Sequence, residues 1–153
     1  MDVTIVSGEQ WLEAVKRLLA DLPEWFGIEQ SVLDYIAAAR TLPTTVALHD
    51  DEVVGVCLVR RQTPVAAEIE LLAVQRSLHR QGVGRNLLQV VERELQASGV
   101  RLLQVKTFGP SGYSEEYQRT RAFYESVGFL PLEERIDIWG PENPCLISVK
   151  PLH

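Results

Sequence analysis

The turn around Gly82 and Gly84 contains residues suited to binding an anion. The segment Leu78–Gln89 reads LHRQGVGRNLLQ, with Arg80 before the glycines and Arg85 after them. An apolar segment precedes this turn and an amphipathic one follows it, which indicates a strand-to-helix connection. The first N–H groups of a helix lack partners within the helix, and glycine lets a ligand approach the backbone closely. The pattern favours a phosphate or pyrophosphate site over glycines that only form a tight turn.

Two carboxylates in the preceding segment could accept a proton. Glu68 and Glu70 alternate with Leu72 in the apolar segment Ala67–Val74, so a regular strand would place all three on one face. Carboxylates in an otherwise apolar strand suit a general base that acts directly or through water. They also suit a solvent-exposed face or a group that anchors a substrate, and the sequence leaves these alternatives open.

Hydrophobic periodicity and turn residues predict the elements that position these groups. The expected strands cover residues 3–6, 45–48, 53–61, 67–74, 100–107, 129–139 and 145–149. The expected helices cover residues 9–19, 31–39, 83–97 and 114–127. Neither repeats nor a linker interrupt this order. We therefore expect one α+β domain over residues 1–153, with helices layered on a sheet.

Composition and charge restrict the class of protein. The chain has 153 residues, of which 46% are hydrophobic and 24% charged, as in ordinary soluble domains. Its formal net charge of -6 disfavours nonspecific nucleic-acid binding, which needs a basic surface, and mildly favours amine ligands. We find no signal-peptide pattern and no membrane-spanning stretch, so we expect a cytoplasmic protein. Cys57 and Cys145 are expected to be reduced core thiols, and no spacing predicts a metal site.

Two motifs resemble the GNAT superfamily of N-acyltransferases, and the element order extends this resemblance over nearly the whole chain. The family places [R/Q]-x-x-G-x-[G/A] between its fourth strand and third helix, where this chain has His79-Arg80-Gln81-Gly82-Val83-Gly84. Its fourth helix carries an aromatic pair followed by Gly-Phe, which corresponds here to Phe123-Tyr124 and Gly128-Phe129. The chain departs from the family at His79, where Arg or Gln is usual, and at Tyr117, where Asn is frequent.

This resemblance implies a fold, an activity and a cofactor. The implied fold is a three-layer α/β/α-like α+β arrangement, with a central mixed, largely antiparallel sheet of six to seven strands and about four helices. The implied activity is transfer of an acetyl group from acetyl-CoA to a primary amine of a small molecule or peptide. Because dimers are common in the family, the resemblance also allows a homodimer.

The resemblance further implies roles for single residues. Tyr124 would protonate the departing thiolate, and Glu68 or Glu70 would deprotonate the amine, with Glu68 the better match by its distance from Val74. A backbone N–H, which we place at Val74, would polarise the thioester carbonyl. The residues expected to hold the acyl donor are Leu72, Ala73, Val74, His79, Arg80, Gln81, Gly82, Val83, Gly84, Arg85, Tyr117 and Thr120.

Three helices and the late-strand hairpin are expected to complete the site. Helical spacing puts Tyr117, Thr120 and Tyr124 on one stripe, with Phe123 and Val127 facing elsewhere. In this fold the first two helices and the late-strand hairpin border the acceptor pocket. They offer Trp25, Phe26 and Trp139, whose rings suit a cationic or apolar amine, although Trp25 and Phe26 could equally cover the core edge.

Two other functions compete with the acetyltransferase interpretation. A non-catalytic acyl-CoA-binding sensor would keep the glycine turn but would tolerate loss of Tyr124 and of both carboxylates. All three residues are present, which favours an enzyme. A dinucleotide-binding oxidoreductase is disfavoured because the turn lacks a third glycine at the required spacing and its strand falls in mid-domain.

Overall fold

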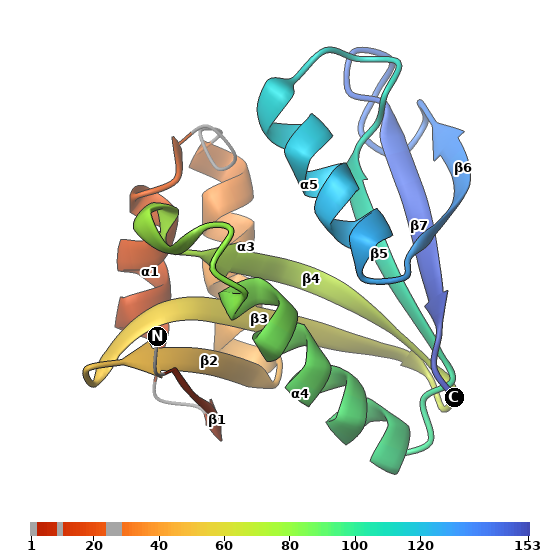
Figure 1. Cartoon of the computed structure of the whole chain (residues 1–153). Helices are drawn as coiled ribbons and strands as arrows, with labels where there is room; N and C mark the ends of the chain where they lie inside the picture. The colour runs from red at the N-terminus through yellow and green to blue at the C-terminus, as the bar shows by residue number, and fades with distance from the viewer. Residues whose placement is uncertain (1–2, 9–10, 24–28) are drawn as a thin grey trace.

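One seven-stranded sheet forms the centre of the computed structural model, which describes residues 3–8, 11–23 and 29–153 (Figure 1). The strand order is β1-β2-β3-β4-β5-β7-β6. Only β4 and β5 pair in parallel, and every other neighbouring pair is antiparallel. The strands are β1 (Thr4–Gly8), β2 (Thr44–His49), β3 (Glu52–Thr63), β4 (Ala66–Val74), β5 (Leu102–Phe108), β6 (Leu130–Arg135) and β7 (Cys145–Pro151).

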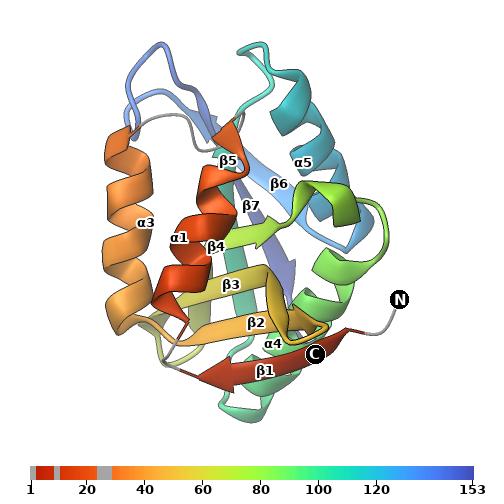
Figure 2. The ribbon, with the colours of Figure 1, turned by 90° about the vertical axis from the view of Figure 1, so that its left-hand side faces the viewer.

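Helices cover both faces of the sheet (Figures 1 and 2). The described helices are α1 (Leu12–Ala20), α3 (Glu29–Thr41), α4 (Val83–Ala97) and α5 (Glu115–Ser126). One core cluster joins α1 and α3 to the sheet, and another joins α4 and α5 to its opposite face. This three-layer α+β arrangement, with seven strands and four helices in the described residues, confirms the expected fold class.

Local sequence signals explain where several of these elements begin and end. The expected helix at residues 83–97 is confirmed as α4, and its apolar stripe is buried. At the start of α5, Ser114 Oγ accepts a hydrogen bond of 3.2 Å from the Tyr117 N–H, as a helix N-cap does. Asp50 and Asp51 both have positive φ, 51° and 64°, which suits the tight turn between β2 and β3.

The strand β4 is irregular at Glu70. Ile69 pairs with Val59 of β3 and Leu71 pairs with Leu58, so Glu70 is an extra residue that forms a β-bulge. The bulge changes which face the side chains occupy: Ile69 packs with the α4 and α5 cluster, whereas Leu71 packs with the α1 and α3 cluster. Leu72 contacts the α4 and α5 side.

The parallel pairing of β4 with β5 stops halfway along both strands. It runs from Ala66 opposite Leu102 to Ile69 opposite Val105. Beyond this point β4 continues to Val74 and β5 continues to Phe108 without pairing with each other. The two strands therefore diverge, and the backbone edge of β4 that faces β5 is available to another group.

The strand β6 is shorter than the sequence predicts. It ends at Arg135, whereas residues 129–139 were expected to be one strand. The Arg135 side chain donates from Nε to Asp137 Oδ1 at 2.9 Å, which fits a bend directly after the strand. Trp139 therefore lies in the loop between β6 and β7 rather than in the sheet.

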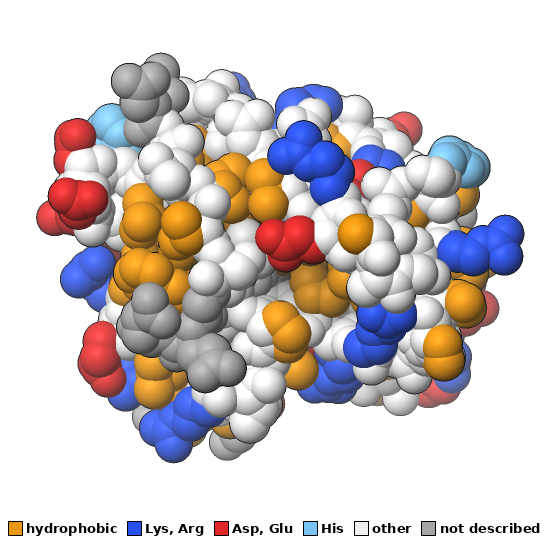
Figure 3. Space-filling model, turned by 90° about the horizontal axis from the view of Figure 1, so that it is seen from below, with side chains coloured by type: hydrophobic (Ala, Val, Ile, Leu, Met, Phe, Trp, Pro, Cys, Tyr) orange, Lys and Arg blue, Asp and Glu red, His pale blue; other side chains and the backbone are white. Residues whose placement is uncertain are grey.

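Three further features concern helix length, the charges on one face and the two cysteines. In the described part of the chain, no helix is long and apolar enough to cross a membrane. On the face shown in Figure 3, basic and acidic side chains are interspersed with hydrophobic ones. Cys57 and Cys145 are free and buried.

Candidate active site

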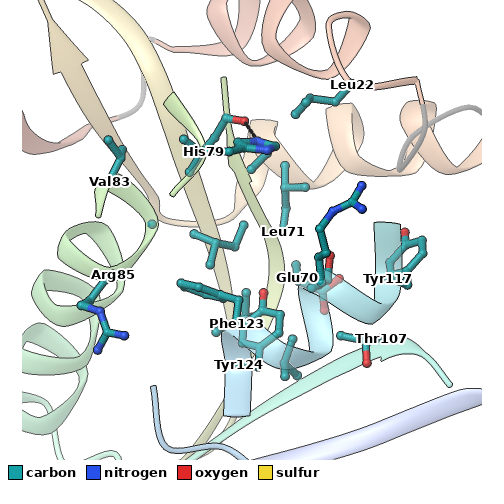
Figure 4. A pocket seen from close by; sticks show the side chains of 18 of the residues that line it. Leu22, Glu70, Leu71, His79, Val83, Arg85, Thr107, Tyr117, Phe123 and Tyr124 are labelled. Carbon is teal, nitrogen blue, oxygen red and sulfur yellow. Dashed lines mark hydrogen bonds between the residues drawn. The ribbon is translucent and has the colours of Figure 1, made fainter. Parts of the chain in front are cut away.

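A cavity of about 550 Å³ lies where β4 and β5 diverge. Residues from β4, β5, α4 and α5 line it, together with the turn before α4 (Figure 4). Tyr35 of α3 and Trp139 of the β6–β7 loop complete the wall. The divergence of two strands therefore creates one space that reaches residues of both helical layers.

The N-terminus of α4 forms one end of this cavity. Asn86 is the first residue to donate back along the helix, to Gly82 O at 3.0 Å, so the N–H groups of Val83, Gly84 and Arg85 have no partner within α4. Gly82 caps the helix with φ of 84°, and a Cβ there would meet nothing within 4 Å. The glycine is therefore required for its backbone conformation, and the space beside it remains open.

Gly84 serves a different purpose from Gly82. A Cβ on Gly84 would lie 3.4 Å from the Phe123 ring and 3.7 Å from a Val74 methyl group. The first turn of α4 can thus pack closely against α5 and the end of β4. Arg80, with φ of 66°, and Arg85 line the same end of the cavity. Unpartnered N–H groups and two arginines make this end suitable for a pyrophosphate.

Backbone groups of β4 point into the space between the strands. Gln75 donates to Val54 O at 2.8 Å, so the neighbouring Val74–Gly55 pair is one without ladder hydrogen bonds. Both backbone polar groups of Val74 therefore point away from β3. The carbonyl accepts a hydrogen bond from His79 Nε2 at 2.6 Å (Figure 4). The same alternation turns the backbone of Leu72 outward and that of Ala73 toward β3.

The structure separates the two candidate carboxylates. Glu70 lines the cavity, whereas Glu68 is buried behind it and is not part of the cavity wall. Glu68 Oε1 accepts from Gln104 Nε2 at 2.8 Å and lies 3.1 Å from Lys106 Nζ. Glu68 and Glu70 lie two residues apart on β4, and the negative charge of Glu68 acts on the Glu70 carboxyl group. The expectation that Leu72 lies with them is wrong, because the bulge at Glu70 breaks the alternation.

The Glu70 carboxyl group is ready to accept a proton. Its Oε1 is buried and accepts no hydrogen bond from the described residues, although Arg60 Nε lies 3.3 Å away. Burial raises the pKa of Glu70 above its ordinary value, and the neighbouring Glu68 raises it further. Arg60 and Lys106 oppose this effect. A carboxylate with a raised pKa is a stronger base than an exposed one.

Tyr124 presents a hydroxyl group to the cavity from α5. The residue is only 7% exposed, and its ring packs edge to face on Phe129 with a centroid distance of 5.2 Å. Its hydroxyl has no hydrogen-bond partner among the residues that the structure describes. Burial raises the pKa of Tyr124 well above its usual range, so the phenol keeps its proton.

Neighbouring residues of α5 also face the cavity. Tyr117 and Thr120 line it as the helical spacing predicts, but Phe123 lines it as well, which the spacing did not predict. The Tyr117 ring lies 5.8 Å from that of Phe108, and burial raises the pKa of Tyr117 to about 12. Thr120 Oγ1 donates to Glu116 O at 3.1 Å.

Sequence reasoning missed several residues of the cavity wall. Tyr35, Lys106 and Thr107 belong to segments that no motif marks. Thr107 Oγ1 is buried and has no hydrogen-bond partner among the described residues. Alternation along β5 could have placed Gln104 and Lys106 on one face, but only the pairing of β5 with β4 puts them beside Glu68.

The remaining predicted residues divide into three groups. Leu72, Ala73, His79, Arg80, Gly82, Val83, Gly84 and Arg85 line the cavity, as does Trp139 on the acceptor side. Gln81 does not, and its side chain donates to Ser77 O at 3.2 Å within the turn. Trp25 and Phe26 lie outside the described residues.

The glycine turn, the divergent strands β4 and β5, and Tyr124 of α5 all lie within the segment that one family model matches. The model for the acetyltransferase (GNAT) domain matches residues 40–131, more than half of the chain. The chain belongs to the GNAT acetyltransferase family. No curated protein matches it at a significant level.

Several solved structures share the fold of this GNAT protein. A protein from Desulfovibrio desulfuricans named as a GNAT-family acetyltransferase is 22% identical, with a TM-score of 0.83 over 99% of this chain and 100% of that one. The ribosomal-protein-S18-alanine N-acetyltransferase of Escherichia coli is 20% identical, with a TM-score of 0.78 over 99% and 94%. A GNAT acetyltransferase from Elizabethkingia anophelis with acetyl-CoA bound is 18% identical, with a TM-score of 0.75 over 98% of each chain.

Proposed function

We propose that this protein is an acetyl-CoA-dependent N-acetyltransferase that acts on a primary amine of a small molecule or peptide. One observation carries the proposal: a single cavity joins the unpartnered N-terminus of α4 to the hydroxyl of Tyr124 and the carboxyl group of Glu70. The structural relatives support it, because one contains acetyl-CoA and another is named for acetylating a protein alanine.

The chain offers suitable groups for each part of the acyl donor. The N–H groups of Val83, Gly84 and Arg85, with the Arg80 side chain, suit the pyrophosphate. The free edge of β4 at Leu72 suits the amides of the pantetheine arm, which can pair with it as a strand would. When bound, acetyl-CoA supplies an acetyl group activated as a thioester.

Glu70 is the residue that we assign to deprotonation of the amine. A free alkylamine has a pKa of about 10.4 and is mostly charged at neutral pH, so it must lose a proton before its nitrogen can attack. Glu70 Oε1 is buried in the cavity wall and accepts no hydrogen bond from the described residues. The Val74 N–H, which points away from β3, is the donor that we assign to polarise the acyl carbonyl.

Tyr124 is the residue that we assign to protonation of the leaving group. As the nitrogen–carbon bond forms, the carbon–sulfur bond breaks and its electron pair stays on sulfur. The Tyr124 hydroxyl gives its proton to this sulfur and regains one when the amide nitrogen loses its second proton. Because burial raises the pKa of Tyr124, the group stays protonated until the thiolate forms.

Binding and turnover can be tested separately. We expect acetyl-CoA and free CoA to raise the thermal stability of the protein, and NAD to leave it unchanged. A ligand at a hundredfold excess over its dissociation constant stabilises the folded state by about 2.7 kcal/mol. A panel of small amines and of peptides with free N-termini, scored by thiol release, then tests for transfer.

The combined results distinguish the candidate functions and test the proposed donor site. Stabilisation by acetyl-CoA with amine-dependent thiol release supports the enzyme. Stabilisation without release from any amine indicates the non-catalytic acyl-CoA-binding module. No stabilisation at saturating acetyl-CoA contradicts the assignment of the α4 N-terminus to the pyrophosphate.

A further inference from the structure

We propose that Glu68 is a positioning residue: anchored by Lys106 and Gln104, it holds Glu70 at the cavity and shares the proton that Glu70 takes from the amine. This inference rests on the proposed function, in which Glu70 is the base. It adds a chain of contacts between β4 and β5 that no motif in the sequence indicates.

Glu68 is fixed from β5 by two donors. Its Oε1 accepts a hydrogen bond of 2.8 Å from Gln104 Nε2, and Lys106 Nζ lies 3.1 Å from the same oxygen. Glu68 and Gln104 are paired residues of the parallel β4–β5 ladder, one position before its last pair. The carboxylate is thus anchored just before the two strands diverge, at 6% exposure.

Glu68 lies two residues before Glu70 on β4, close enough for its negative charge to act on the Glu70 carboxyl group. Two carboxyl groups can hydrogen-bond only when one of them carries a proton. Lys106 and Gln104 already donate to Glu68, so after Glu70 has taken the proton from the amine, Glu70 can donate it to a Glu68 oxygen. The bulge places Glu70 at the cavity while Glu68 remains behind it.

Charges of both signs face Glu70, so their effects can be separated. Among the described residues, the charged groups that face Glu70 are Arg60 on β3, Glu68 on β4 and Lys106 on β5. The titratable phenol of Tyr35 on α3 also faces it. Asp34 acts on Tyr35, and α1 contributes the apolar Leu22 to the cavity. The Glu68 charge favours protonated Glu70, whereas Lys106 favours ionised Glu70.

The test is the pH dependence of kcat/KM for the amine at saturating acetyl-CoA. Glu68→Gln removes the negative neighbour, so we expect the midpoint of the acid limb to move to lower pH. Lys106→Gln removes the positive neighbour, so we expect it to move to higher pH. Glu92→Gln is the matched control, because Glu92 also pairs with a lysine, Lys150 at 2.8 Å, but lies outside the cavity wall. It should leave the midpoint unchanged.

Opposite shifts from Glu68→Gln and Lys106→Gln cannot arise from a general loss of structure, and they support the proposal. Unmoved midpoints in both variants overturn it. Glu70→Gln distinguishes this failure from failure of the proposed base: if it removes the acid limb, Glu70 is the base and only the role of Glu68 is wrong. If Glu70→Gln keeps the limb, both assignments are wrong. If Glu68→Gln fails to fold, the acid-limb midpoint of Lys106→Gln is the deciding measurement. A shift to higher pH supports the proposal, and no shift or a shift to lower pH overturns it.

Discussion

His79 Nε2 lies 2.6 Å from Val74 O, so a side chain of the turn holds the end of the strand that precedes it. A carbonyl oxygen only accepts hydrogen bonds, so Nε2 carries the proton. This contact fixes the position of the α4 N-terminus relative to the free edge of β4. Both parts of the proposed donor site therefore depend on one hydrogen bond.

Replacing this imidazole should weaken binding of acetyl-CoA. One hydrogen bond contributes about 0.5–1.5 kcal/mol, so we expect His79→Leu to lower the affinity by about two- to tenfold. Isothermal titration with acetyl-CoA measures the change. His79→Gln, which keeps a donor and matches the family pattern, should recover much of the loss. Equal affinities of wild type and His79→Leu would show that the contact has no part in donor binding.

Gly82 allows a test of the turn with a closely matched control. Gly82 and Gly140 have φ of 84° and 94°, and a Cβ on either would meet nothing within 4 Å. Alanine at either position should cost about 1–2 kcal/mol of unfolding free energy, because only the backbone conformation opposes it. We expect Gly82→Ala alone to weaken acetyl-CoA binding. A similar loss of affinity in Gly140→Ala would contradict the assignment of this turn.

Tyr124→Phe separates the chemistry from the fold. The hydroxyl has no partner among the described residues, so its removal should leave the melting temperature unchanged. A general acid contributes about 10²- to 10⁴-fold, and we expect kcat to fall by at least the lower figure. Thiol release under saturating substrates measures this loss. Tyr113→Phe, at a residue 84% exposed, is the control. Full activity of Tyr124→Phe would exclude its role as the acid.

Glu70 should make stability depend on pH. Burial raises its pKa above 4.5 in the folded protein, so the folded state holds this proton more tightly than the unfolded chain does. The stability from the protonated form is complete below the unfolded pKa and is lost as pH rises through the folded pKa. Glu70→Gln should therefore raise the melting temperature more at alkaline pH than at acid pH, while it lowers activity. A gain that is equal at both would show that Glu70 is not perturbed.

Trp139 tests the acceptor side of the cavity. The side chain lines the cavity although the residue is 43% exposed, so it can contact an incoming amine. We expect Trp139→Ala to raise KM for the amine about tenfold, equivalent to about 1.4 kcal/mol, and to leave acetyl-CoA binding unchanged. Ile136→Ala, in the same loop but outside the cavity wall, is the control. An effect on acetyl-CoA alone would place Trp139 at the donor instead.

Elements whose signals are local could be predicted from the sequence. The stripe of apolar residues after Gly82 predicted α4 with its observed bounds, and the acidic turn at Asp50 and Asp51 predicted the β2–β3 hairpin. The glycine turn and Tyr124 were recognisable for the same reason, because their meaning depends on neighbours within a few residues. All of these line the cavity or support the sheet that forms it.

The tertiary structure alone decided how the two carboxylates differ. Strict alternation placed Glu68, Glu70 and Leu72 on one face, but the bulge opposite Leu58 and Val59 moved Leu72 to the other face. The anchor of Glu68 comes from β5, more than thirty residues later in the chain. A bulge and a parallel register depend on how distant strands pack together, and periodicity within one strand contains no information about either.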